Sequence, residues 1–125
     1  MLIKRLDNCE RIEGLDGTTI RELLNPHHEE REVKLGYSLA HAMLDPGETS
    51  KPHRFFEASE VYYILSGRGV MHIDDKAANV QEGDAVYIPP QGVQHIENTG
   101  SETLEFLCIV FPAWTPDAEE LVESS

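Results

Sequence analysis

Short apolar runs recur along the chain, and clusters of glycine, proline, aspartate and asparagine separate them. Few of these runs have the 3.6-residue period of an amphipathic helix, so the pattern predicts an antiparallel sandwich or barrel. The predicted strands cover residues 18–24, 35–44, 60–65, 69–73, 85–88, 94–98 and 104–111. The turns between them include DPG at 45–47, SGRG at 66–69, EGD at 82–84 and NTGS at 98–101, all of which contain residues that turns favour.

Two of the predicted strands lack a simple alternation of apolar and polar residues. The segments VYYIL at 61–65 and LEFLCIVF at 104–111 are apolar at consecutive positions, which is typical of strands that are covered on both faces. We therefore expect a second copy of the chain against one sheet, and hence a homodimer.

The ends of the chain differ from this strand-rich middle. We interpret the protein as a single domain, because 125 residues are enough for one core and short for two. Its parts are an irregular N-terminal arm (1–17), a barrel (18–111) and a C-terminal tail (112–125). A short C-terminal helix is expected over the segment DAEELV, since Thr115 could cap it and Pro116 suits the first helical position.

Charge narrows the range of partners. The chain has 23 acidic and 10 basic residues, a formal net charge of -13, which repels nucleic acid and anionic membrane surfaces. A charged leader followed by a long apolar run is not present, so we expect a soluble, cytoplasmic protein that binds neither nucleic acid nor membrane. The two cysteines do not have metal-ligand spacing, and Cys108 is expected in the core.

Two stretches have a spacing of polar residues and glycines that is informative about function. The first contains Gly47, His53, Phe55, Glu60 and Gly67. The second contains Gly83, Pro89, Pro90, Gly92, His95 and Asn98. Together they resemble the two motifs of the cupin superfamily, the first of which usually holds a His-x-His pair and a glutamate. The resemblance implies an all-β double-stranded β-helix, or jelly-roll cupin barrel, and it extends to the small single-domain cupins of type 2 that are mannose-6-phosphate isomerase-like.

The first motif predicts a polar pocket inside the barrel. Residues two apart on a strand share a face, so His53 and Phe55 are expected to point inward, as are Glu60 and Tyr62 on the next strand. By the resemblance, His53 and Glu60 are candidate metal ligands. Phe55 stands where the family has a histidine and cannot coordinate a metal, so we expect Phe55 and Tyr62 to form apolar walls that contact a ligand.

The second motif leaves two registers open. Counted from Pro90 and Gly92, His95 occupies the ligand position; counted back from Asn98, Gln94 does. A shift of one residue turns a side chain to the opposite face of the strand. The register with Gln94 inward is favoured because it directs Ile96 to the core, while a bulge after Gly92 would turn His95 inward.

Three functions agree with these residues. The first is a metal-dependent oxygenase or isomerase with a weakly bound divalent metal (Fe, Mn, Ni or Zn), of which the oxygenase requires His53, Glu60 and His95 to face inward together. The second is a non-catalytic module that binds a small molecule, metal-free because Phe55 replaces a ligand. The third is a scaffold cupin that binds another protein. A pocket function ranks above the scaffold, because a scaffold has no need of His53 and Glu60 at this spacing.

Overall fold

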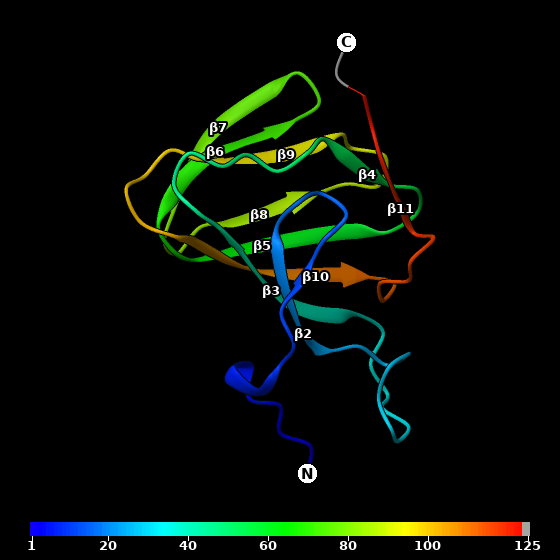
Figure 1. Ribbon diagram of the computed structural model, residues 1–125. Coiled ribbons are helices and arrows are strands. Elements are labelled where there is room, and N and C mark those ends of the chain that lie inside the picture. Colours follow the sequence, from blue (N-terminus) through cyan, green and yellow to red (C-terminus); the bar gives the residue numbers. More distant parts are fainter. Residues whose placement is uncertain (124–125) are drawn as a thin grey trace.

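The computed structural model of the protein describes residues 1–123 and consists of two antiparallel sheets that face each other (Figure 1). The six-stranded sheet has the order β1-β2-β3-β10-β5-β8, and the five-stranded sheet has the order β11-β4-β9-β6-β7. The elements are η1 (Leu6–Asn8), β1 (Ile12–Glu13), β2 (Thr19–Leu24), β3 (Ser38–Leu44), β4 (His53–Phe55), β5 (Ser59–Ser66), β6 (Arg68–Ile73), β7 (Lys76–Gln81), β8 (Ala85–Ile88), β9 (Gln94–Asn98), β10 (Leu104–Phe111) and β11 (Glu119–Leu121).

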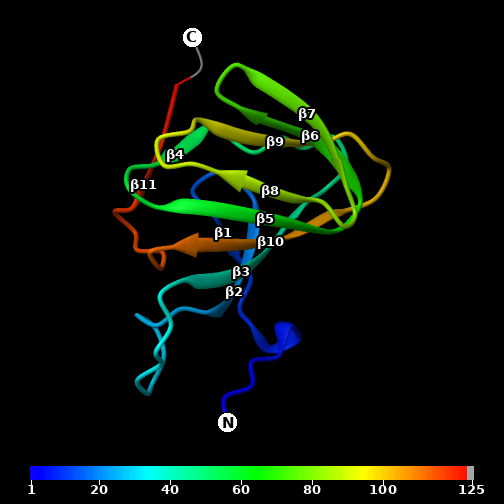
Figure 2. The ribbon, with the colours of Figure 1, turned by 180° about the vertical axis from the view of Figure 1, so that it is seen from behind.

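The sandwich confirms the all-β cupin-type architecture expected from the apolar runs. Seen from both sides (Figures 1 and 2), β4, β6, β7 and β9 form one layer, and β5, β8 and β10 lie in the layer opposite. Glycines close the tight turns: Gly67 and Gly83 have φ values of 89° and 90°, a conformation that glycine adopts at little cost. No helix among residues 1–123 is long and apolar enough to cross a membrane.

The interior changes from apolar to polar along the strands. On β5 the inward residues are Glu60, Tyr62 and Ile64, and each lies opposite an inward residue of β10, with Val110 facing Glu60 and Phe106 facing Ile64. The apolar core fills the Ile64 end of the barrel and consists of Ala42, Leu44, Tyr62, Ile64, Met71, Val80, Ile88, Ile96, Leu104, Phe106 and Cys108. The Glu60 end of the barrel interior contains a polar pocket.

The expected C-terminal helix is wrong. Residues 116–118 form a turn, and Glu119–Leu121 pair with β4 as the edge strand β11. The Thr115 hydroxyl donates to the Asp117 carboxylate at 2.7 Å instead of capping a helix. A helix of this length is only marginally stable in water, whereas β4 offers an open edge for backbone hydrogen bonding. The last two residues of the predicted tail lie outside the described part of the chain.

Candidate functional site

A cavity of about 340 Å³ lies between the two sheets at the Glu60 end of the barrel. Its inner wall contains His53, Phe55, Glu60 and Tyr62, the four residues of the first motif that were expected to face inward. The segment 12–18 and the segment 114–119 complete its mouth. In Figure 1 these are the blue loop that reaches up from the six-stranded sheet and the orange-red stretch that joins β10 to β11. Residues from both ends of the chain therefore enclose a pocket built on the barrel strands.

His53 has a defined orientation and tautomer. The side chain is 3% exposed, and its Nδ1 lies 2.8 Å from the carbonyl oxygen of Lys51. A carbonyl oxygen only accepts, so Nδ1 must carry a proton and donate it. In the neutral imidazole Nε2 is then an acceptor, and it lies 3.8 Å from Oδ2 of Asp16. His53 thus presents its basic nitrogen to the carboxylate that borders the pocket.

Glu60 is a buried carboxyl that is held by one hydrogen bond. The side chain of Gln94 donates Nε2 to its Oε1 at 3.0 Å. Burial holds the pKa of Glu60 well above its ordinary value; the hydrogen bond from Gln94 opposes this rise, and the nearby Glu119 and Asp16 carboxylates add to it. Part of the Glu60 population therefore keeps its proton at pH values where an exposed glutamate has lost it.

The structure has the register in which Gln94 points into the barrel. Gln94 is fully buried on β9, directly opposite His53 of β4. Its Oε1 is buried and has no hydrogen-bond partner within residues 1–123. His95 lies on the other face of β9, where its ring stacks on His72 with centroids 4.2 Å apart and planes 10° from parallel. His95 and His72 are therefore outside the pocket.

Phe55 and Tyr62 form apolar walls. Both side chains are at least 97% buried, since Phe55 is 3% and Tyr62 2% exposed. The Tyr62 ring packs on Phe106 with centroids 4.5 Å apart. Burial raises the pKa of Tyr62 well above its ordinary value, and the Glu60 carboxylate adds to the rise, so the phenol stays protonated and can donate a hydrogen bond.

Two carboxylates that the sequence did not reveal also line the pocket. Asp16 sits in the loop after β1, where its Oδ1 accepts hydrogen bonds from the backbone and hydroxyl of Thr18 at 3.1 and 2.7 Å. Its own carbonyl accepts from the backbone N–H of Lys51 at 2.7 Å, which joins the loop to the strand that carries His53. Glu119 reaches the pocket because β11 pairs with β4, opposite Phe55. Burial raises its pKa, His53 opposes the rise, and Asp16 adds to it.

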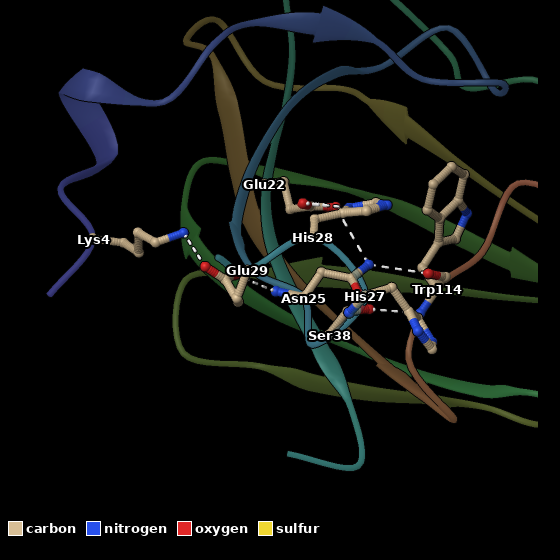
Figure 3. A network of polar contacts seen from close by, with 8 residues as sticks. All are labelled: Lys4, Glu22, Asn25, His27, His28, Glu29, Ser38 and Trp114. Carbon is tan, nitrogen blue, oxygen red and sulfur yellow. Dashed lines mark hydrogen bonds and ion pairs between the residues drawn. The ribbon is translucent and has the colours of Figure 1, made fainter. Parts of the chain in front are cut away.

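A polar network holds Trp114 at the mouth of the pocket (Figure 3). The Ser38 hydroxyl accepts the backbone N–H of Trp114 at 3.0 Å, and Asn25 donates Nδ2 to the Trp114 carbonyl, also at 3.0 Å. Asn25 is fully buried, and its own N–H donates to Glu29, which pairs with Lys4 of the arm. No local sequence motif indicated this network or the carboxylates of Asp16 and Glu119. Their residues come together only because the two chain ends pack against the barrel.

The transition-metal site implied by the cupin resemblance does not fit the residues of this pocket. Phe55 has no lone pair, Gln94 uses its amide N–H on Glu60, and His95 lies outside. Within residues 1–123, no three histidine, cysteine, aspartate or glutamate side chains converge as metal ligands do. At the positions that the cupin motifs assign to metal ligands, His53 and Glu60 are fewer than the three or four protein ligands that zinc usually takes.

Comparison with known proteins agrees with the architecture. A sequence profile described as "Cupin domain" matches residues 40–110. An uncharacterized protein of Methanocaldococcus jannaschii is 40% identical over 86% of this chain and 84% of its own length. The oxalate-binding protein of Thermotoga maritima is 31% identical over 81% of this chain and 84% of its own. The crystal structure of a predicted oxalate decarboxylase from Thermotoga maritima superposes with a TM-score of 0.74 at 28% identity, covering 89% of this chain and 99% of that one.

Proposed function

The chain belongs to the cupin family, and on that premise we propose that it binds a small organic molecule in the barrel pocket, oriented by His53, Glu60 and Gln94. The observation that carries this proposal is that a buried imidazole and a buried carboxyl border one cavity of about 340 Å³. That volume lies in the range typical of small-molecule sites, which combine apolar walls with a few polar groups. Phe55 and Tyr62 supply such walls.

Binding in this pocket does not require a transition metal. The polar groups that reach the cavity are an imidazole, a carboxyl with a raised pKa and an amide, and all three can hydrogen-bond an organic ligand directly. A divalent metal would find one imidazole and one carboxylate at the former ligand positions, so we expect its binding to be weak and easily reversed.

Acid–base catalysis is the second candidate function. His53 can offer Nε2 as a base, and burial raises the pKa of Glu60 so that it keeps its proton to higher pH than an exposed glutamate. A base and an acid are the two groups that an isomerase or a lyase needs. We do not extend this proposal to an oxygenase, since that reaction needs a redox metal and an inward-facing His95. A sugar phosphate, as for a mannose-6-phosphate isomerase-like cupin, would need cationic groups, and none of the described lining residues is lysine or arginine.

A scaffold that uses only its outer surface is disfavoured by energetics. Burying an imidazole and a carboxyl costs free energy unless each is fully paired, and the Oε1 of Gln94 has no partner within residues 1–123. A barrel that served only as a scaffold would be more stable with apolar residues at these positions. The polar pocket is therefore better explained by a ligand.

The test is a ligand screen on metal-stripped protein by ligand-observed NMR, with hits measured by calorimetry. We expect hits that bind wild type at least tenfold more tightly than His53→Ala or Glu60→Gln. His95→Ala is the matched control, because His95 is a half-buried histidine outside the pocket. Hits that bind His53→Ala and wild type equally would place the ligand elsewhere and refute the proposal.

A further inference from the structure

We propose that the pocket takes an organic cation, a protonated amine on a compact apolar body; this inference rests on the proposed function and specifies its ligand class. Five acidic residues line the cavity, namely Glu13, Asp16, Glu22, Glu60 and Glu119. Among the described lining residues there is no lysine or arginine, and His53 is the single basic side chain. A cavity lined by five acidic side chains and one basic side chain attracts cations and repels anions.

Three of these carboxyls, on Asp16, Glu60 and Glu119, line the same cavity and influence one another electrostatically. Asp16 Oδ2 lies 3.8 Å from His53 Nε2. Glu60 and Glu119 are each close enough to Asp16 for its charge to raise their pKa values, after the larger effect of burial. Without a bound cation, burial and the mutual repulsion of these groups favour protonated carboxyls, whereas a cation among them would favour the ionised forms. A bound cation would relieve that repulsion.

The hydrogen-bonding groups point to the same kind of ligand. When the imidazole of His53 is neutral, its hydrogen bond to the Lys51 carbonyl leaves Nε2 as an acceptor. Gln94 Oε1 is an acceptor inside the barrel, fully buried and without a donor within residues 1–123. A ligand that satisfies these atoms must donate hydrogen bonds, and an ammonium group donates three while accepting none.

Aromatic side chains provide the rest of the site. Phe55, Tyr62, Phe106 and Trp114 all line the cavity, and the faces of aromatic rings attract cations in addition to packing against apolar groups. Trp114 is held at the mouth by the buried Asn25 and by Ser38 (Figure 3). Carboxylates beside aromatic walls suit an amine whose carbon skeleton is small enough for about 340 Å³.

Three probes of similar shape and different charge test the inference: 2-phenylethylamine, 2-phenylethanol and 3-phenylpropanoate. Each is titrated calorimetrically into metal-stripped wild-type protein at pH 7. We expect the amine to bind at least tenfold more tightly than the alcohol and the acid to show no binding. Because this comparison needs no variant, it does not depend on how a substitution affects folding.

Variants then locate the charge. Asp16→Asn and Glu119→Gln should each weaken amine binding about fivefold or more and leave alcohol binding unchanged, while Glu97→Gln, on the outward face of β9, should change neither. Equal binding of amine and alcohol, tighter binding of the acid, or no binding of any probe at millimolar concentration overturns the cation inference. A different result would refute the proposed function: a screen in which no ligand binds more weakly to His53→Ala than to wild type.

Discussion

Phe55 and Gln94 set the chemistry of the pocket, because both lie on inward faces beside His53 and neither can replace an imidazole. Phe55 is 3% exposed and fills space without a lone pair. Gln94 donates to Glu60 and keeps it in place. With a ring and an amide at these two positions, the pocket lacks two of the imidazoles that the cupin motifs imply. Both side chains fit the packed interior.

Restoring the two imidazoles should restore metal affinity. We expect Phe55→His with Gln94→His to bind nickel or zinc about a hundredfold more tightly than wild type, since each correctly placed imidazole adds a favourable ligand. Calorimetric titration of metal into stripped protein measures this. Arg54→His is the control, because residue 54 alternates to the outward face of β4 between His53 and Phe55. An equal gain in the control would show that any added histidine suffices.

The raised pKa of Glu60 predicts how stability depends on pH. A carboxyl whose pKa is higher in the folded than in the unfolded state contributes stability that is complete below the unfolded value and is lost as pH rises through the folded value. Glu60→Gln cannot ionise and can still accept a hydrogen bond from Gln94. Its free energy of unfolding should exceed that of wild type by about 1 to 3 kcal/mol at pH 8 and match it near pH 4.5.

Urea unfolding at the two pH values measures the difference, with Glu97→Gln on the outer face of β9 as control. A Glu60→Gln variant that is less stable than wild type at pH 8 would show that the ionised carboxylate has a stabilising partner in the folded state.

Part of this site was predictable from the sequence and part was not. His53, Phe55, Glu60 and Tyr62 follow from strand alternation within one motif, and the structure has all four in the cavity. The choice between Gln94 and His95 depended on a register that one bulge could reverse. Asp16, Trp114 and Glu119 could not be found, because their place depends on contacts between distant segments.

At the scale of elements, most of the barrel strands were predicted, whereas β4 and β7 were not among the predicted strands and the chain ends were predicted poorly. The strands at 85–88, 94–98 and 104–111 have the predicted bounds, because turn-forming residues lie between them. The strand β11 was predicted as a helix, since acidic residues after a proline suit a helix start as well as an edge strand. The local conformational preference of these residues therefore could not distinguish a helix from a strand. Backbone pairing with β4 makes the segment a strand.

The two chain ends have a common structural role in the pocket. The loop after β1 is joined to the strand that carries His53 through the Lys51 N–H and the Asp16 carbonyl. The strand β11 is joined to β4 by backbone pairing and by the ion pair of Arg54 with Glu120, whose Nη2 and Oε1 are 2.6 Å apart. Each end contributes one carboxylate to the lining of the pocket, Asp16 from the N-terminal side and Glu119 from the C-terminal side.

At the scale of the whole molecule, the outer face of the six-stranded sheet has several exposed large apolar side chains. Tyr63, Leu65, Tyr87 and Phe111 are 41%, 37%, 62% and 59% exposed. The register of β5 with β8 and β10 places them on the face opposite the core, with Leu107 beside Tyr63. Large apolar patches of this kind mark association surfaces on soluble proteins. They give a structural basis for the homodimer expected from the two-sided apolar strands.

We therefore expect wild type to be a dimer at micromolar concentration in size-exclusion chromatography with light scattering. Tyr63→Glu with Tyr87→Glu should give a monomer with an unchanged circular dichroism spectrum, because two charges buried between copies would each lose hydration without a partner. The control is Ala77→Glu with Asn79→Glu, which adds the same charge to exposed positions of β7 in the other sheet. Since the pocket lies between the sheets, the monomer should keep the ligand affinity of wild type. A wild-type monomer at tens of micromolar, or a dimer that survives the tyrosine substitutions while the control dissociates, would show that this face is not the interface.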